Sequence, residues 1–249
     1  MVTLYLQKQF NPLKRTSIHR VVSFFIFHMN YLIHQLLNSE EINFIEKELE
    51  QHNQEWEDGK KTAGQHAAKV KNNLQLRRDS DLSKNFSRLI TRKILSNELI
   101  KSFALPKKVH GTMFSKSKSG MKYGRHIDNA YMSSGRADLS FTLFLNCKDN
   151  YDGGVLSIES FNSEEKFKLD AGEIIIYPST YLHSVEEVFG GERLVFIGWI
   201  ESYVKSIEER EYLFDLDAAA RSLLSKYGRS DEVDLIFKTY SNILRRLGS

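Results

Sequence analysis

The stretch that decides the fold is residues 173–200, which reads EIIIYPSTYLHSVEEVFGGERLVFIGWI. Three runs rich in β-branched and aromatic residues alternate in it with turn-forming residues, a pattern typical of short strands. The turn signals are Pro178–Thr180 and Gly190–Gly191, and the expected strands are Glu173–Tyr177, Leu182–Val188 and Arg193–Ile200. We expect the glycine pair to form the hairpin turn between the last two strands.

The same rhythm extends upstream to Val109. Turn signals at Lys118–Gly120, Asn150–Gly154 and Asp170–Gly172 separate five further expected strands, which are Val109–Phe114, Tyr123–Ile127, Leu139–Leu145, Val155–Glu159 and Lys166–Leu169. Eight short strands at this spacing favour a jelly roll or barrel over a parallel α/β sheet. The predicted fold class is therefore a mainly β core with flanking helices (α+β).

Helical patterns flank this core on both sides. Ser39, followed by two glutamates, predicts a capped helix start, and residues 82–103 predict a second amphipathic helix that ends before Pro106. After the strands, an apolar stripe ends at Gly228, and a last helix begins with acidic residues and closes with Arg245 and Arg246. We expect these C-terminal helices to cover a face of the sheet.

Four regions follow from this pattern. They are a poorly structured extension at 1–28, an N-terminal helical and edge region at 29–108 that packs on the core, the strand core at 109–203, and a C-terminal helical segment at 204–249. The extension contains a short apolar run, but the run is much shorter than the ~20 residues needed to span a bilayer. We therefore expect no membrane association.

The charge distribution argues against nucleic acid as a partner. The net charge of the chain is +3, and residues 1–28 carry four basic residues and no acidic one, which leaves −1 for the remainder. A near-neutral body lacks the cationic surface that phosphate backbones require. Cys147 is the only cysteine, which fits a reducing compartment such as the cytoplasm.

A histidine and an aspartate lie two residues apart, in or at the end of an expected strand. Alternate strand residues point to one side, so His126 and Asp128 share a face while Ile127 points away. A neutral nitrogen and an anionic oxygen are two of the three ligands of a facial triad, which leaves positions open for oxygen and substrate. His183 lies 55 residues downstream on a strand of the same core and is the natural third ligand.

Arg193 is the fourth element of the expected site. With a hairpin at Gly190–Gly191, Arg193 pairs near Glu187–Val188, roughly 13–17 Å along the strand from His183 at ~3.3 Å per residue. A planar guanidinium binds a carboxylate through two parallel hydrogen bonds, which a lysine cannot reproduce. The spacing leaves room for a small dicarboxylate between Arg193 and the metal.

Several further motifs, in order, make the sequence resemble the PKHD-type hydroxylases, a bacterial branch of the prolyl 4-hydroxylase-like Fe(II)/2-oxoglutarate oxygenases. The resemblance begins near Met29 and runs to the end of the chain. The matching stretches are Trp56–Gly59 with Thr62–Gly64, Val70–Asn73, Tyr123–Asp128, Arg136–Ser140, Tyr151–Gly154 and Tyr177–Ser179 before His183. One departure is Val155, where relatives often carry Glu.

The resemblance implies a double-stranded β-helix (jelly roll) core, Fe(II) at His126, Asp128 and His183, and 2-oxoglutarate at Arg193. It also implies consumption of O2, coupling of 2-oxoglutarate decarboxylation to succinate with hydroxylation of a substrate, and L-ascorbate to keep the iron ferrous. Some relatives are associated with iron uptake or homeostasis, so the resemblance also implies a link to iron homeostasis. The sequence leaves the primary substrate and the oligomeric state undetermined.

Two alternatives stay open at this point. A cupin-like metal-binding sensor or binding module without oxygenase turnover would use the same barrel, although it has no need of a buried carboxylate anchor such as Arg193. Tyr123 either hydrogen-bonds the co-substrate or packs in the barrel wall. Asn72 and Asn73 either contact substrate or form turn hydrogen bonds.

Overall fold

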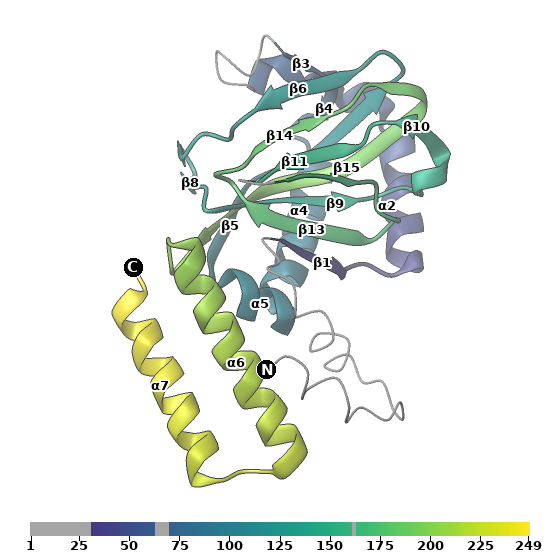
Figure 1. Cartoon of the computed structure of the whole chain (residues 1–249). Coiled ribbons are helices and arrows are strands. Elements are labelled where there is room, and N and C mark those ends of the chain that lie inside the picture. The colour runs from purple at the N-terminus through teal and green to yellow at the C-terminus, as the bar shows by residue number, and fades with distance from the viewer. Residues whose placement is uncertain (1–30, 63–69, 161–162) are drawn as a thin grey trace.

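The computed structural model describes residues 31–62, 70–160 and 163–249, so the predicted extension at 1–28 lies outside the described residues. Figure 1 shows a two-sheet core with a pair of long helices extending away from it. The strands of the core are β1 (Leu32–Gln35), β2 (Trp56–Asp58), β3 (Lys71–Asn72), β4 (Leu74–Leu76), β5 (Pro106–Lys118), β6 (Lys122–His126), β7 (Tyr131–Met132), β8 (Gly135–Arg136), β9 (Leu139–Phe144), β10 (Tyr151–Gly153), β11 (Leu156–Glu159), β12 (Glu164–Phe167), β13 (Glu173–Pro178), β14 (Leu182–Val185) and β15 (Val188–Ser202).

Two antiparallel sheets face each other. The larger has the order β1-β13-β9-β15-β5-β4-β2, with β10 beside β15, and the smaller has the order β12-β11-β14-β6-β3. Strands β7 and β8 form a separate two-stranded sheet. A strand is present at each of the eight predicted positions, and the mainly β core with flanking helices is confirmed.

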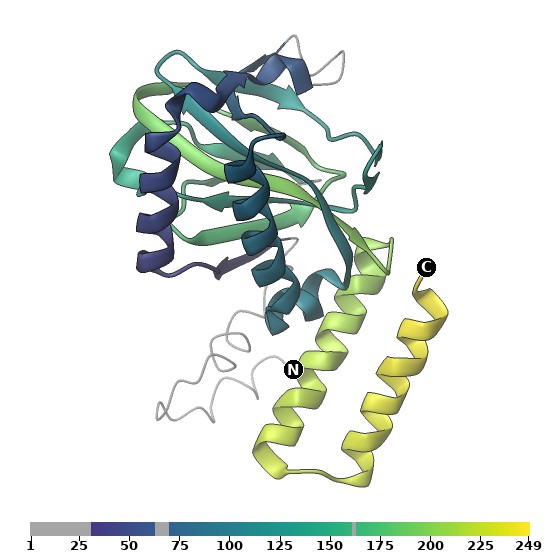
Figure 2. The same ribbon diagram turned by 180° about the vertical axis from the view of Figure 1, so that it is seen from behind.

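Two apolar layers hold the sheets in place. The layer between them is formed by Phe144, Leu156, Ile158, Phe167, Ile175, Tyr177 and Val195. The layer outside the larger sheet includes Phe114, Phe141 and Phe196, together with residues of α2 (Ser39–Gln51), α4 (Asp81–Ser96) and α5 (Glu98–Ala104). Figure 2 shows α2 and α4 lying across this outer face, which leaves the opposite face of the sheet for the barrel interior.

The helix starts follow capping chemistry, with one correction. The side chain of Asn38, not Ser39, caps α2: its oxygen accepts a hydrogen bond from the backbone N–H of Glu41, whose carboxylate accepts one in return from Asn38 N–H. The single helix expected over 82–103 is also two, because Asn97 ends α4 and caps α5. Leu105 then adopts a left-handed conformation, and β5 begins at Pro106.

The glycine pair Gly190–Gly191 is not a hairpin turn, and that prediction was wrong. Both glycines lie inside β15 and pair with β10, where the sequence suggested only a turn. Gly191 has φ +71°, and a side chain there would collide with the carbonyl of Asn150. The chain therefore leaves the smaller sheet after Val185 and enters the larger sheet at Val188.

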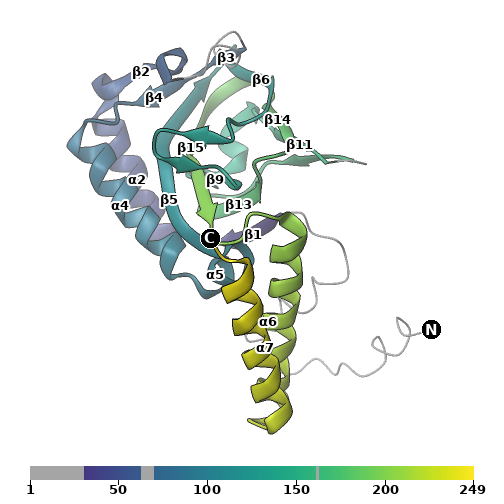
Figure 3. The same ribbon diagram turned by 90° about the vertical axis from the view of Figure 1, so that its left-hand side faces the viewer.

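The C-terminal helices differ from expectation in where they pack. Helices α6 (Ile207–Tyr227) and α7 (Asp231–Leu247) have the predicted Gly228 and charged ends. Figure 3 shows them as a hairpin that projects from the end of the core near α5 instead of covering a sheet face. A small apolar cluster of Leu105, Val204 and Leu213 anchors the pair. No helix in the described part of the chain is both long enough and apolar enough to cross a membrane.

Candidate metal and co-substrate site

The structure brings His126, Asp128 and His183 together in the barrel interior. His126 ends β6 and lies directly opposite His183 of β14 in the smaller sheet. Asp128 follows β6 after Ile127, whose side chain is 54% exposed on the other side. One possible ligand atom from each of the three residues lies within 4.8 Å of the others. Two nitrogens and one carboxylate at this separation are the donor set of a facial triad.

Both histidines are oriented by a backbone carbonyl two residues before them in the chain. Nδ1 of His126 lies 2.8 Å from the carbonyl oxygen of Gly124, and Nδ1 of His183 lies 3.1 Å from that of Tyr181. A protonated Nδ1 that donates to a carbonyl leaves the lone pair on Nε2, where a metal binds. Burial and the neighbouring His183 lower the pKa of His126 to about 4, so its imidazole is neutral at pH 7.

Two serines hold the carboxylate of Asp128. The hydroxyl of Ser140 donates to Asp128 Oδ2 at 2.6 Å, and Ser179 Oγ lies 2.8 Å from Ser140 Oγ. Because Ser140 gives its proton to Asp128, Ser179 is the donor in the second bond. Both serines are almost fully buried. This chain fixes the carboxylate before any metal binds, as hydrogen bonds to metal ligands commonly do.

Arg193 also faces the barrel interior, but not through the register expected from the sequence. It pairs with Ser117 of β5 in the larger sheet, instead of with the end of β14. Along β15, Val195 belongs to the layer between the sheets while Leu194 and Phe196 face the helices, so the two-residue period places Arg193 on the inner side. Its guanidinium carbon lies 5.3 Å from the centre of the Phe144 ring.

The surroundings of Arg193 suit an anionic ligand. The arginine is 3% exposed, and its guanidinium lies against the buried hydroxyl of Tyr151. In the described part of the chain, neither Arg193 Nε nor the Tyr151 hydroxyl has a partner in good hydrogen-bond geometry. Burial lowers the pKa of Arg193, and the nearby Tyr151 and Tyr177 only partly oppose this effect. A charged donor that is buried without a hydrogen-bond partner costs about 1–3 kcal/mol or more. A carboxylate bound here would satisfy both orphaned donors.

The three residues with open roles have distinct positions. The Tyr123 ring stacks on the His126 ring with centres 3.6 Å apart, so it supports a proposed metal ligand from the side. The amide of Asn72 donates to the Gly120 carbonyl at 3.3 Å, and the buried amide of Asn73 donates to Ser115 Oγ at 2.6 Å. Asn72 thus ties β3 to the turn between β5 and β6, and Asn73 ties the following residue to β5.

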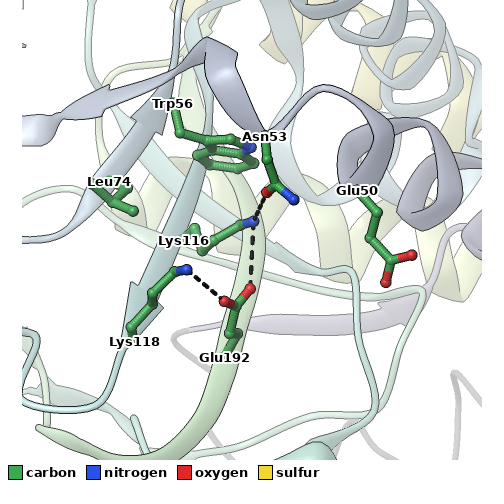
Figure 4. A pocket seen from close by; sticks show the side chains of 7 residues that line it. All are labelled: Glu50, Asn53, Trp56, Leu74, Lys116, Lys118 and Glu192. Atoms are coloured by element: carbon green, nitrogen blue, oxygen red, sulfur yellow. Dashed lines mark hydrogen bonds and ion pairs between the residues drawn. The ribbon is translucent and has the colours of Figure 1, made fainter.

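A hollow lies on the outer face of the larger sheet, away from this cluster. It has a volume of about 200 Å³ and is lined by Glu50, Asn53, Trp56, Leu74, Lys116, Lys118 and Glu192. Figure 4 shows the Lys116 side chain next to the Trp56 ring, with its ammonium 3.2 Å from Asn53 Oδ1 and 3.4 Å from Glu192. Lys118 pairs with the same glutamate at 2.8 Å. These contacts balance the charges within the hollow and fasten the end of α2 to the sheet.

Sequence reasoning missed Ser140, Ser179, Tyr151 and Tyr177 as parts of the site. Three of the quoted motifs contain them, but a motif does not tell which of its residues faces the interior. The period-two pattern of β9 could have identified Ser140, because it shares a face with Thr142 and Phe144. Tyr151 had no such signal, since its segment was taken for a turn.

Comparison with known families gives two matches. Residues 112–201 match the 2OG-Fe(II) oxygenase superfamily, and residues 208–248 match the PKHD-type hydroxylase C-terminal domain. Similar curated proteins include a PKHD-type hydroxylase of Prochlorococcus marinus strain MIT 9215, which is 74% identical over 220 residues. That alignment covers 88% of this chain and the whole of the relative. A PKHD-type hydroxylase of strain MIT 9211 is 57% identical with the same coverage.

Solved structures support the fold. A prolyl-4-hydroxylase from Pseudomonas putida has a TM-score of 0.53 at 18% identity, covering 74% of this chain and 98% of that one. A prolyl hydroxylase from Trichoplax adhaerens, solved with a peptide fragment of hypoxia inducible factor, has a TM-score of 0.53 at 13% identity. That alignment covers 81% of this chain and 97% of the Trichoplax chain. At these identities the likeness concerns the fold alone.

Proposed function

The chain belongs to the PKHD-type hydroxylases and is a 2-oxoglutarate-dependent dioxygenase of the 2OG-Fe(II) oxygenase superfamily, and we propose that His126, Asp128 and His183 hold its iron while Arg193 binds 2-oxoglutarate. The observation that carries the assignment is the convergence of two nitrogens and one carboxylate within 4.8 Å, inside the barrel that also buries Arg193. The family implies Fe(II), 2-oxoglutarate and O2.

The residues present fit both groups. Each histidine has one nitrogen committed to a backbone carbonyl, which directs the other nitrogen toward the cluster. Ser140 supplies a neutral donor to Asp128 and therefore leaves the carboxylate charge for the cation. At the other end, Arg193 Nε and the Tyr151 hydroxyl offer two buried donors to the distal carboxylate of the keto acid.

The protein contributes position and exclusion of water. Bound iron would supply the oxidation chemistry, in which O2, 2-oxoglutarate and the substrate C–H bond give succinate, CO2 and the hydroxylated substrate. Arg193 fixes one end of the co-substrate by charge and direction, so that its keto acid end meets the metal ligands. The apolar layer around Phe144, Tyr177 and Val195 lines this space and keeps the site dry.

Three finer points belong to the same proposal. We infer that L-ascorbate keeps the iron ferrous, because relatives of this family are described as requiring it. A cytoplasmic location is supported by the lone cysteine, Cys147, which is a free thiol in the structure. The expected link to iron uptake or homeostasis stays a prediction. The cupin-like sensor is not favoured, because the family to which the chain belongs consists of enzymes and Arg193 is buried.

The metal assignment is tested by replacing each proposed ligand with alanine. Asp128→Ala, His126→Ala and His183→Ala should each lose tightly bound iron and 2-oxoglutarate-dependent succinate formation while remaining folded. The measurements are iron stoichiometry on the purified proteins, circular dichroism, and succinate produced under air. His34→Ala is a matched control, because His34 lies on β1 outside the cluster and should keep its iron. Full iron retention in Asp128→Ala would refute the assignment.

A further inference from the structure

Lys71 is a buried cation beside the proposed metal ligands that the proposed function does not yet use. It is 5% exposed and lies on β3, the edge strand of the smaller sheet, opposite Tyr123 of β6. Its ammonium lies 5.5 Å from the centre of the Tyr123 ring, which itself stacks on His126. Lys71 thus reaches the metal cluster from the β3 edge, whereas Arg193 lies on β15 in the middle of the larger sheet.

Charged groups act on Lys71 from two sides. Its positive charge helps to lower the pKa of His126, and Asp128 in turn favours the charged form of Lys71. Arg78 opposes that form, and Asp58 favours it. Lys71 therefore interacts electrostatically both with the metal ligands and with charged residues near β2 and β4. Burial is the main reason that the pKa of Lys71 falls to about 8.

Arg78 belongs to the same part of the barrel wall. Its Nη2 lies 3.5 Å from the sulfur of Met113, which also receives a hydrogen bond from Gln75 Nε2 at 2.8 Å. Met113 is on β5, two positions from Ser115 and four from Ser117, so it shares the inner side on which Arg193 lies. The buried Lys71 and the more exposed Arg78 therefore lie in the same part of the barrel, with Lys71 on the side of the metal ligands.

This region is electropositive once the site is loaded. Asp58 and Asp128 balance Lys71 and Arg78, but the proposed divalent iron on Asp128 adds two positive charges. The two carboxylates of 2-oxoglutarate are opposed by Arg193, so the net charge remains positive when the co-substrate is bound. A neutral substrate would gain nothing from this arrangement, whereas an anion would be attracted and oriented.

We propose that the primary substrate carries a carboxylate that binds at Lys71 and Arg78, which places its reacting C–H bond beside His126, Asp128 and His183; this inference rests on the proposed function. A carboxylate between these cations would accept charge-assisted hydrogen bonds from Lys71 Nζ and the Arg78 guanidinium. Lys71 and Arg78 would then determine specificity. The carboxylate can come from a small organic acid or from an acidic side chain of a peptide.

The test compares matched acids and amides on the protein loaded with Fe(II) and saturating 2-oxoglutarate under anaerobic conditions. The small-molecule pair is N-acetylglycine and N-acetylglycinamide, and the peptide pair is Ac-Ala-Glu-Ala-NH2 and Ac-Ala-Gln-Ala-NH2. Binding beside the metal shifts the charge-transfer band of the Fe(II)–2-oxoglutarate complex, whereas competition for the 2-oxoglutarate site only lowers its intensity. We expect at least one acid to shift the band at a concentration about tenfold or more below that of its amide.

The variants separate a role in recognition from a role in folding. Lys71→Met should remove the preference for the acid over the amide, because a purely structural defect would weaken both probes alike. Lys71→Arg should keep the preference. Lys122→Met is the matched control, since Lys122 lies on β6 with an exposed side chain paired to Glu187. If Lys71→Met fails to fold, Arg78→Gln, at a position less buried than Lys71, should reduce the same preference.

Each outcome decides between the two proposals. The carboxylate site would be overturned by equal responses to acid and amide or by no band shift with either acid. It would also be overturned by an unchanged preference for the acid in Lys71→Met or Arg78→Gln. A shift caused only by N-acetylglycine would indicate a small acid, and one caused only by the glutamate peptide would indicate a peptide. Absence of the band in the wild-type protein would instead contradict the proposed function.

Discussion

Ser140 is the residue that most directly fixes the geometry of the proposed metal ligands. Its hydroxyl donates to Asp128 and is itself held by Ser179. Ser140→Ala should weaken iron affinity by about 10–100-fold, because the substitution removes the hydrogen bond that orients Asp128. It also removes the acceptor of the Ser179 hydroxyl. Competition of a calibrated iron chelator with the purified protein measures the change.

The control for that substitution is Ser83→Ala. Ser83 is equally buried, at 3% exposure, but it lies on α4 on the other side of the larger sheet. It should lower stability without changing iron affinity. If both variants bound iron as the wild type does, Ser140 would have no part in positioning Asp128.

At this scale the sequence predicts the ligands better than their supports. Strand phase places His126 and Asp128 on one face because the two-residue period holds for any strand. The serines that hold Asp128 come from β9 and from the end of β13, which are 39 residues apart. Such contacts depend on how strands pair, and a single sequence does not specify that pairing.

Among the elements, the contact between β10 and β15 decides where Arg193 lies. Tyr151 pairs with Gly191 and Gly153 pairs with Val188, which places the Tyr151 ring and the Arg193 side chain together. Gly153 has φ +71°, and a Cβ there would lie 2.0 Å from the carbonyl oxygen of Glu187. Only glycine meets both requirements, and the strand pairing depends on it.

Gly153→Ala should therefore destabilise the protein by about 3 kcal/mol, from backbone strain and a collision that must be relieved by moving β15. Gly120→Ala is the matched control, because Gly120 has φ +80° but nothing within 4 Å of its Cβ position. It should cost only the strain, about 1–2 kcal/mol. Urea unfolding of both variants gives the comparison, and equal losses would contradict the collision argument.

The glycine pair at Gly190–Gly191 shows why the connection of the last two strands was predicted wrongly. Paired glycines between apolar runs are a good hairpin signal, but glycine also allows the close approach of another strand. Here β10 takes that place, and β14 and β15 belong to different sheets. Arg193 still faces the barrel interior, but its neighbours differ from those expected.

For the molecule as a whole, the described fold begins with contacts that lie beyond residue 29. The Tyr31 hydroxyl donates to Glu165 at 2.6 Å, and Leu32 pairs with Ile176 at the edge of the larger sheet. A protein that starts at Met29 keeps both contacts and should match the full chain in melting temperature and iron content. A large loss of either would show that residues 1–28 contribute to the fold. A protein that starts at Ser39 lacks β1 and should melt lower.

The position of the C-terminal helices was not predictable from their own sequence. Their apolar stripe suggested a long buried face. In α6, however, Leu213 and Ala220 are buried, whereas Leu223 and Leu224 are more than a third exposed. The anchoring contacts come from Leu105 and Val204, which lie in other parts of the chain. An amphipathic pattern indicates that a helix has a partner but not which partner it has.

The central claim is that one barrel holds iron at His126, Asp128 and His183 and 2-oxoglutarate at Arg193. It is tested most directly by titrating 2-oxoglutarate into the Fe(II) protein without oxygen and following the metal-to-ligand charge-transfer band. The wild type should give a saturable band, Arg193→Ala should keep its iron but not form the band, and Arg193→Lys should bind about 1.5–3 kcal/mol more weakly, roughly ten- to a hundredfold. Wild-type affinity in Arg193→Ala, or no band in the wild type, would contradict the account.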